Sequence, residues 1–337
     1  MSRITVLGSG AWGTAIALSL VSKGGHRVTL WAHRVKAAEA LNQSRENLHF
    51  LPGFRFPKSL MVTADEAQAV ADAEILVCVV PSEFLRSTLA RLAPHMHAGQ
   101  VVISATKGME DHTYLRMTEV ILSCLADCGI ELPTGALSGP SFAQEVAAGM
   151  PTAVTIAFAD ASVAAEIQKE FSSSTLRLYT NDDVIGVEMG GALKNVIAIA
   201  AGVLAGMGLG QNSAAGLITR GIAEMTRLAV AAGGQRETLR GLSGVGDLVL
   251  TCTGSLSRNR TVGLELGRGR QLAEILASLE GKVAEGVRTT RAALGLARKL
   301  GVEMPITEQM ELILDEGKDP KEAIRDLMLR PGRQEED

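Results

Sequence analysis

The chain has 337 residues, a length that suggests one large domain or two of ordinary size. Hydrophobic residues make up 46% of it and charged residues 21%, so the chain can bury a substantial core and is not disordered. The formal net charge of −4 gives no global sign of binding to nucleic acid or to a membrane surface, and it leaves room only for a local basic pocket that takes a small anion.

The first half of the sequence predicts alternating strands and helices. Short apolar runs predict strands at 3–7, 27–31, 74–80, 100–105, 135–138, 152–158 and 175–179. Helical spacing follows the first two strands, at 11–23 and 35–42. Several of the runs are continuously apolar and rich in β-branched residues, as expected for parallel strands buried on both faces. This half therefore predicts a Rossmann-type doubly wound α/β sheet.

The pattern changes near residues 181–183. Helical periodicity then predicts helices at 184–204, 213–232, 261–268, 272–279, 289–300, 307–315 and 320–329. The last one has a clear start, because Asp319 can cap it and Pro320 suits its first turn. We expect a dinucleotide-binding domain over 1–182 and an all-helical substrate-binding domain over 183–337.

The cysteines and the apolar segments bear on location. The four cysteines, Cys78, Cys124, Cys128 and Cys252, show neither CxxC nor zinc-type spacing, so we expect no metal site and a reducing, cytoplasmic environment. Glycines interrupt the N-terminal apolar stretch, so no signal peptide is expected. The longest apolar segment, 196–210, is too short and glycine-rich for a membrane span and favours a buried helix.

The sharpest motif lies between the first strand and the first helix, where residues 6–13 read VLGSGAWG. Gly8 permits the tight turn out of the strand, Gly10 allows backbone to approach a pyrophosphate, and Gly13 lets the helix pack closely on the sheet. The helix N-terminus adds unpaired N–H groups and a partial positive charge. A GxGxxG alone is weak, but its place in a βαβ unit predicts dinucleotide binding rather than a structural turn.

The end of the second strand indicates which dinucleotide is bound. A fold specific for NAD usually has an acidic residue here that binds the ribose 2′-hydroxyl, whereas this chain has His33 and Arg34. A guanidinium suits a 2′-phosphate. We expect NADP(H), with NAD(H) tolerated; the alternative is a solvated loop arginine.

A nicotinamide cofactor that reduces a carbonyl group supplies the hydride, and the protein must then supply a proton donor near the oxygen. The six histidines lie in loop-like or polar settings, and none is in a motif of the helical half. Lys194 lies in a long apolar stretch, and the next cation downstream is Arg220. A buried lysine is costly unless paired, and burial would lower its pKa toward neutrality. Lys194 is therefore the candidate proton donor, unless it snorkels to the surface.

Two further segments carry candidate polar residues. Asp247 follows a glycine-containing turn and could bind substrate hydroxyls, orient Lys194 or cap a helix. Residues 257–260 read SRNR and are dense in hydrogen-bond donors that suit an anion, which favours a loop that leads into a pocket, with Arg258 ahead of Arg260. A bare sequence of this kind is more often a solvated surface loop. Lys107 follows a strand, where open α/β sheets bind ligands.

Taken together, the motifs resemble one family. GSGAWG, ATKG at 105–108, SGPSFA at 138–143, GGALKN at 190–195, GDL at 246–248 and SRNR at 257–260 occur over nearly the whole chain. In this order and spacing they resemble bacterial NAD(P)-dependent glycerol-3-phosphate dehydrogenase. That family interconverts dihydroxyacetone phosphate and sn-glycerol 3-phosphate, and the latter feeds phospholipid synthesis.

The resemblance implies a role for each matching residue. Those it places at the cofactor, besides the three glycines, are Ala11, Trp12, His33, Arg34, Phe50, Lys107, Ala143, Arg258, Val283 and Glu285. Those it places at the substrate are Lys107, Gly139, Ser141, Lys194, Asp247, Ser257, Arg258 and Asn259, with Lys194 as the catalytic proton carrier. Ala11 departs from the family pattern, which often has serine there; the loss is one hydrogen bond to phosphate. Glycine- and alanine-rich helices are expected to form the seam of a homodimer.

Two other functions fit part of this pattern. One is a β-hydroxyacid or 6-phosphogluconate-type dehydrogenase, which has the same layout and also uses a lysine. The other is a non-catalytic dinucleotide sensor, which would need no buried proton donor and so leaves Lys194 unexplained.

Overall fold

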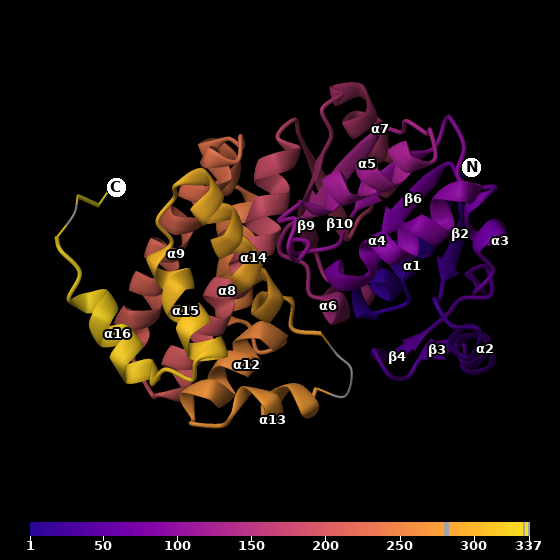
Figure 1. The fold of residues 1–337 in the computed structure, drawn as a ribbon. Coiled ribbons are helices and arrows are strands. Elements are labelled where there is room, and N and C mark those ends of the chain that lie inside the picture. The colour runs from indigo at the N-terminus through magenta and orange to yellow at the C-terminus, as the bar shows by residue number, and fades with distance from the viewer. Residues whose placement is uncertain (280–282, 333, 336–337) are drawn as a thin grey trace. The chain divides into compact units, whose positions relative to one another are not determined.

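The computed structural model describes residues 1–279, 283–332 and 334–335 and divides into two compact units. The first unit comprises Met1–Thr106 and Met117–Val184, and the second comprises Lys107–Arg116 and Ile185–Asp337. Figure 1 shows sheet and helices in the first unit and helices throughout the second. The predicted division at residue 182 did not include the segment Lys107–Arg116, which packs with the helical unit.

An eight-stranded sheet forms the centre of the first unit, in the order β10-β9-β8-β7-β6-β1-β2-β5. Its strands are β1 (Ser2–Leu7), β2 (His26–Trp31), β5 (Met61–Thr63), β6 (Ile75–Cys78), β7 (Val101–Ser104), β8 (Thr134–Ser138), β9 (Thr152–Ala157) and β10 (Leu176–Asn181). Neighbouring strands are parallel except for β8 and β9, which are antiparallel. The Rossmann-type α/β fold is thus confirmed.

Two features of the sheet were not predicted. The three-residue strand β5 pairs with β2 at one edge, and it is too short to show a period of two. The reversal at β9 is the second, because a short connection through the five-residue helix α6 (Ala143–Ala147) joins β8 to β9. A short connection suits antiparallel strands, whereas parallel strands need a longer crossover. As a result, the start of β9 lies at the same edge of the sheet as the end of β8.

The helices of the first unit cover this sheet. They are α1 (Ala11–Lys23), α2 (Val35–Ser44), α3 (Glu66–Val70), α4 (Ser82–Leu92), the short 3-10 helix at Ala93–His95, α5 (Met117–Asp127), α6 and α7 (Ala161–Phe171). A small separate ribbon, β3 (Glu46–Asn47) with β4 (Leu51–Arg55), follows α2. All four residues of β6 are buried, as expected for a central parallel strand covered on both faces.

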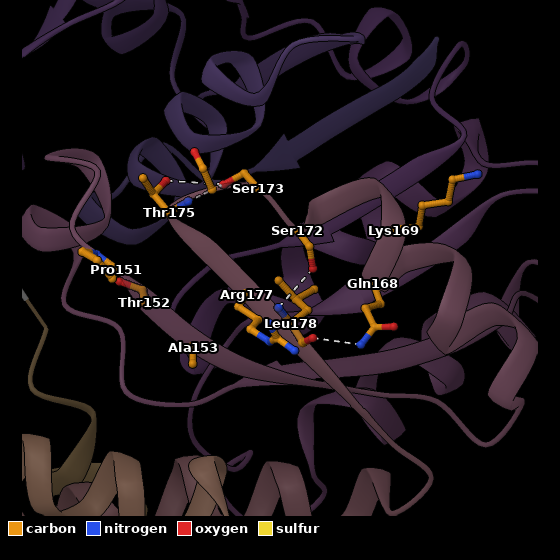
Figure 2. A pocket seen from close by; sticks show the side chains of 11 residues that line it. Pro151, Thr152, Ala153, Gln168, Lys169, Ser172, Ser173, Thr175, Arg177 and Leu178 are labelled. Atoms are coloured by element: carbon orange, nitrogen blue, oxygen red, sulfur yellow. Dashed lines mark hydrogen bonds between the residues drawn. The ribbon is translucent and has the colours of Figure 1, made fainter.

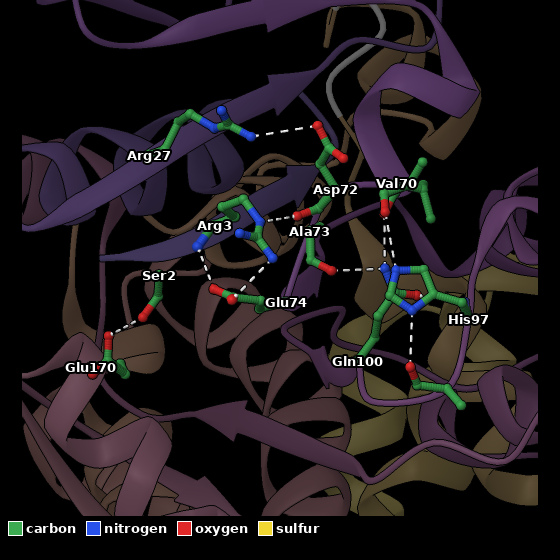
Figure 3. Close-up of polar contacts among 12 residues, drawn as sticks. Ser2, Arg3, Arg27, Val70, Asp72, Ala73, Glu74, His97, Gln100 and Glu170 are labelled. Atoms are coloured by element: carbon green, nitrogen blue, oxygen red, sulfur yellow. Dashed lines mark hydrogen bonds and ion pairs between the residues drawn. The ribbon is translucent and has the colours of Figure 1, made fainter.

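Polar side chains close the edge of the sheet where β1, β2, β6 and β7 begin (Figure 3). The Gln100 side chain donates to the main-chain oxygens of Val70 and Ala73, both at 2.8 Å. Glu74 accepts from the main-chain nitrogen of Arg3 at 2.9 Å and forms an ion pair with its side chain. These contacts hold the loops that start the strands, and we assign them no role in binding.

The second unit is built around one long apolar helix. Its helices are α8 (Val184–Gly206), α9 (Gln211–Ala231), α10 (Arg236–Leu239), the π-helical turn Leu242–Gly246, α11 (Asp247–Thr253), α12 (Arg258–Gly267), α13 (Leu272–Ala277), α14 (Glu285–Leu300), α15 (Pro305–Asp315) and α16 (Pro320–Met328). In the described chain α8 alone is long and apolar enough to cross a membrane, and 83% of its most apolar window is buried. It is the core helix of this unit, as the prediction of a buried helix requires.

Glycines set the spacing between α8 and α12. A Cβ added to Gly202 would lie 2.1 Å from the Arg260 carbonyl oxygen, and one added to Gly263 would lie 1.9 Å from the Ile199 carbonyl oxygen. Neither position can carry a side chain at this distance, so the two helix backbones are in direct contact. Gly202 of α8 is therefore used for a contact within the unit.

Candidate active site

The glycine-rich turn of the first unit has the geometry that the sequence predicts. Gly8 has φ +125°, and a Cβ there would lie 2.7 Å from the Val79 carbonyl oxygen. A Cβ on Gly13 would lie 1.9 Å from the Gly8 carbonyl oxygen, so α1 can meet the turn only through glycine. Gly10 differs, since an added Cβ would meet nothing within 4 Å. The backbone at Gly10 therefore lies open to a ligand.

The N-terminus of α1 opens onto this space. Gly10 caps the helix without a side-chain hydrogen bond, and Ala11 and Trp12 form its first turn. Main-chain N–H groups in a first turn have no partner within the helix and carry a partial positive charge. An open turn, an uncapped helix end and the absence of side chains at Gly8 and Gly10 fit the pyrophosphate of a dinucleotide.

Asn47 braces the turn, and sequence reasoning missed it. Its buried side chain donates to the Ser9 carbonyl oxygen and to Thr14 Oγ1, both at 2.8 Å. Its Oδ1 accepts from the main-chain nitrogen of Phe50 at 3.1 Å. Phe50, a predicted cofactor contact, is thereby tied to the glycine turn. Asn47 is 38 residues from Ser9 in a segment without periodicity, so no sequence pattern indicated the contact.

A basic group lies at the end of β2. His33 and Arg34 are both exposed there, and Arg34 occupies the position before the first turn of α2. Arg91, near the end of α4, places a guanidinium nitrogen 3.1 Å from His33 Nδ1 and forms an ion pair with Glu66. Sequence reasoning missed Arg91, because it lies 58 residues from His33. This group can hold a second phosphate more readily than a ribose hydroxyl.

Gly139, Ser141 and Ala143 lie along the connection from β8 to α6. Gly139 has φ +145°, and a Cβ there would lie 2.9 Å from the Val154 Cα, so the backbone requires glycine. Ser141 Oγ donates to the Gly139 carbonyl oxygen at 2.9 Å, which folds the connection back on itself. Ala143 begins α6 and packs, with Trp12 of α1, on a small apolar cluster around Ala15.

The second unit brings three of the predicted residues into direct contact. Asp247 is fully buried, and its carboxylate forms ion pairs with Lys194 and with Lys107, the latter at 2.6 Å. Lys194 Nζ also donates to Thr251 Oγ1 at 2.7 Å, which sequence reasoning did not find. Thr251 lies one turn after Asp247 on α11, a spacing that places both on one helix face. Lys194 is 5% exposed, so it does not snorkel to the surface.

The surroundings of Lys194 shift its proton equilibrium. Burial is the largest effect and lowers the pKa of Lys194 to about 7, Asp247 opposes this effect, and the Lys107 cation adds to it. The expectation of a buried lysine with a lowered pKa is thus met by the structure. A group with this pKa exchanges its proton near neutral pH, as a general acid and base must.

A π-helical turn positions Asp247 next to Lys194. The turn Leu242–Gly246 runs directly into α11, which Asp247 begins. A Cβ on Gly190 of α8 would lie 2.4 Å from the Ser243 carbonyl oxygen, so the turn rests directly on the backbone of α8. Gly190 is one helical turn before Lys194. Gly190 of GGALKN thus lets α8 approach the turn that precedes α11, and π-turns often occur at functional sites.

The polar segment 257–260 lies beside Lys194. Ser257 caps α12 through the Arg260 main-chain nitrogen at 3.2 Å, so residues 257–260 begin a helix and are not the loop that we predicted. Asn259 Oδ1 accepts from the Gly286 main-chain nitrogen at 3.0 Å. A Cβ on Gly286 would lie 2.6 Å from the Asn195 carbonyl oxygen, which brings this group against α8 next to Lys194.

Arg258 and Glu285 complete this group. Desolvation lowers the pKa of the Arg258 guanidinium, and the Glu285 carboxylate counteracts that effect. Glu285 is the first residue of α14, and Val283, half buried, lies two residues before it. The resemblance placed all three at the cofactor, and the structure places Glu285 near Arg258.

A pocket of about 690 Å³ lies elsewhere in the first unit, where β9 and β10 begin. Its lining includes Ser172 and Gln168, which satisfy the main-chain nitrogen and oxygen of Leu178 on the edge strand β10 (Figure 2). These side chains are occupied in closing a sheet edge. Within the described residues no cluster of His, Cys, Asp and Glu suits a metal ion.

The fold and these two residue groups define a class: dehydrogenases with a dinucleotide-binding Rossmann unit and a helical unit that carries a buried lysine. Profiles described as the N-terminus and C-terminus of NAD-dependent glycerol-3-phosphate dehydrogenase match residues 3–164 and 183–325. The chain belongs to the NAD-dependent glycerol-3-phosphate dehydrogenase family.

Individual relatives are similar over their whole length. A glycerol-3-phosphate dehydrogenase (NAD(P)+) of Acidobacterium capsulatum is 61% identical over 99% of this chain and 100% of the relative. One of Koribacter versatilis is 55% identical over 99% of both chains. The crystal structure of glycerol-3-phosphate dehydrogenase from Coxiella burnetii has a TM-score of 0.92 at 39% identity and covers 98% of this chain and 99% of its own.

Proposed function

We propose that this chain interconverts dihydroxyacetone phosphate and sn-glycerol 3-phosphate with NAD(P)(H), and so supplies glycerol 3-phosphate for phospholipid synthesis. The observation that carries the proposal is the buried Lys194 paired with Asp247, in a chain whose whole length belongs to this family. A ketone reduction needs exactly one proton at the oxygen, and a buried lysine with a pKa of about 7 meets that need.

The proton step follows from the contacts of Lys194. In reduction its ammonium donates a proton from Nζ to the carbonyl oxygen of the substrate, and in oxidation the neutral amine takes the proton back. Asp247 and Thr251 hold Nζ in place, since both bond to it. Lys107 shares the Asp247 carboxylate and adds a second cation that stabilises the developing alkoxide.

The phosphate of the substrate is assigned to the start of α12. Ser257, Arg258 and Asn259 lie at the N-terminus of a ten-residue helix, whose partial positive charge favours a dianion. Arg258 adds a guanidinium that can bind phosphate through two hydrogen bonds. We assign Gly139 and Ser141 of the first unit to the substrate side as well.

The cofactor is assigned to the glycine turn and the basic group of the first unit. Gly8, Gly10, Ala11, Trp12 and Gly13 would hold the pyrophosphate, and the bound nicotinamide supplies the hydride. We assign the 2′-phosphate of NADP(H) to Arg34 with His33, supported by the guanidinium of Arg91 beside them. Phe50, Ala143, Val283 and Glu285 are further proposed cofactor contacts.

Two broader proposals concern the state of the protein in the cell. We propose a cytoplasmic location, supported by four free cysteines, of which Cys78, Cys124 and Cys252 are buried. We also propose a homodimer, with the exposed apolar side chains of Leu209 and Val230 on the helical unit as candidates for its interface. Light scattering after size-exclusion chromatography tests the second.

The experiment that tests the reaction follows NADPH or NADH oxidation at 340 nm with dihydroxyacetone phosphate. Lys194→Ala should lower kcat by about 10²–10⁴-fold and leave the Kd for NADPH unchanged, since the glycine turn belongs to the other unit. Lys194→Arg should not restore activity, because arginine keeps its proton near neutral pH. If Lys194→Arg recovers the wild-type kcat, Lys194 acts only as a charge that anchors the substrate and not as the proton donor.

A further inference from the structure

We propose that Arg116, through its buried ion pair with Glu188, is a positioning residue that holds Lys107 against Asp247. This inference rests on the proposed function, because Lys107 and Asp247 belong to the proton-transfer group described above. It assigns a purpose to the segment Lys107–Arg116, which leaves the first unit after β7 and returns to it at α5.

The segment is a loop whose two ends are joined across a β-bridge. Met109 pairs with Arg116 in an antiparallel bridge, so the position of Arg116 fixes that of the residues that follow Lys107. Met109 is 2% exposed and belongs to the core of the helical unit. Lys107 is two residues before Met109, and its Nζ reaches Asp247 at 2.6 Å.

Arg116 fastens this loop to the helix that carries the proton donor. Its Nη1 lies 2.6 Å from Glu188 Oε2, and the two side chains are only 14% and 6% exposed. Glu188 lies on α8, six residues before Lys194. Glu188 and Lys194 lie on the same buried helix, so their separation is fixed. The ion pair thereby fixes the position of the loop that carries Lys107 relative to α8.

Two further contacts of the loop differ from this buried ion pair. Arg288 and Asp111 form an ion pair at 3.3 Å whose side chains are 42% and 38% exposed, and exposed pairs contribute little. The Tyr114 ring packs against Gly295, where an added Cβ would lie 2.2 Å from the Tyr114 Cζ. This contact is apolar and involves no ion pair. The Arg116–Glu188 pair combines burial with charge, and breaking a buried pair costs more than breaking an exposed one.

Displacement of Lys107 has a measurable consequence at Lys194. The charged groups that face Lys194 are Asp247 on α11, which raises its pKa, and Lys107 on the loop, which lowers it. Cys252, also on α11, is a buried thiol whose pKa is raised to about 12, so it stays neutral. Moving Lys107 away removes a lowering effect, so the pKa of Lys194 rises. Reduction requires the protonated form of Lys194, so its rate falls as the pH rises above this pKa. The alkaline limb of the pH profile of kcat/KM for reduction therefore moves to higher pH.

The experiment compares pH profiles of kcat/KM for dihydroxyacetone phosphate. Arg116→Met should lower kcat/KM by about 10²-fold, the loss typical of a group misplaced by 1 Å. Arg116→Met should also move the alkaline limb to higher pH, which is the shift that we expect for Lys107→Met. The combined Lys107→Met/Arg116→Met variant should move it no further than Lys107→Met alone. Arg116→Lys, which keeps the charge, should recover part of the activity.

Two further variants separate positioning from folding. Arg116→Met/Glu188→Gln removes both charges of this pair, so its melting temperature should return toward that of the wild type while kcat/KM stays low and the limb stays shifted. Arg298→Met, which breaks an exposed pair with Glu311, is the matched control and should change neither.

Some outcomes would overturn the inference. Activity that returns with stability in Arg116→Met/Glu188→Gln would show that Arg116 serves folding only. A lowered kcat/KM with an unmoved limb, or additive shifts with Lys107→Met, would show that Arg116 does not act through Lys107. Failure of the proposed function looks different, because the wild type itself would then not oxidise NADPH with dihydroxyacetone phosphate.

Discussion

A single methyl group on Gly190 tests whether the approach of α8 and the π-helical turn creates the site. In Gly190→Ala the new Cβ would lie 2.4 Å from the Ser243 carbonyl oxygen and 3.0 Å from its carbonyl carbon. Both obstructing atoms are backbone, so no side-chain rotation relieves the clash. The turn must retreat, and it takes Asp247 with it, because α11 begins directly after the turn.

The size of the effect follows from the distances. Ordinary van der Waals contact begins near 3.4 Å, so the turn must move back by about 1 Å from 2.4 Å. A displacement of 1 Å in a catalytic group costs about 10²-fold in rate, which corresponds to about 2.7 kcal/mol in the barrier. Overpacking a buried contact also destabilises the fold by about 1–3 kcal/mol.

The assay measures kcat/KM for dihydroxyacetone phosphate, the Kd for NADPH by fluorescence titration, and the free energy of unfolding. Gly216→Ala is the matched control: Gly216 also lies within a helix, but an added Cβ there meets nothing within 4 Å. The control should keep full activity and gain up to about 1 kcal/mol of stability. If Gly190→Ala keeps wild-type kcat/KM, the close approach of α8 and the turn does not set the Lys194–Asp247 contact.

Three further predictions concern the cofactor, the phosphate and the proton. Arg34→Asp should raise the KM for NADPH far more than that for NADH, and equal effects would remove Arg34 from the 2′-phosphate site. Arg258→Ala should weaken binding of dihydroxyacetone phosphate by on the order of 2–4 kcal/mol and leave unphosphorylated dihydroxyacetone, a poor substrate, nearly unaffected; equal losses would mean that Arg258 only holds the start of α12. Asp247→Asn removes the group that raises the pKa of Lys194, so the alkaline limb of the reduction profile should move to lower pH, opposite to Lys107→Met, and a limb that stays in place would mean that it does not report Lys194.

The sequence was sufficient for the fold because the signals were local. Continuous apolar runs predicted the parallel strands, and the start of α16 was predicted because Asp319 caps it through the Lys321 main-chain nitrogen. The reversal at β9 could not be predicted, since an apolar run reads the same in either direction. The attachment of Lys107–Arg116 to the helical unit depends on contacts with residues such as Glu188, 72 positions away from Arg116.

The candidate site was predictable where one residue was unusual in its own segment. Lys194 stood out as a charge in an apolar helix, and Gly8 and Gly13 stood out by their spacing. Thr251 and Asn47 did not stand out, because a threonine in a helix and an asparagine in a loop are ordinary until the fold supplies a partner. The sequence predicts a loop at residues 257–260 because their many polar side chains hide the helix that Ser257 caps.

The buried carboxylate of Asp247 connects these observations. Two lysines and one carboxylate leave a net positive charge in a place with little water, which is unfavourable unless an anion binds or one lysine loses its proton. Lys194 is the more deeply buried of the two lysines, and burial is the largest of the effects that lower its pKa to about 7. Lys107 is 21% exposed and so remains in contact with solvent. This unequal burial singles out Lys194 as the proton donor, and the loop fastened by Arg116 holds Lys107 on the other oxygen of the shared carboxylate.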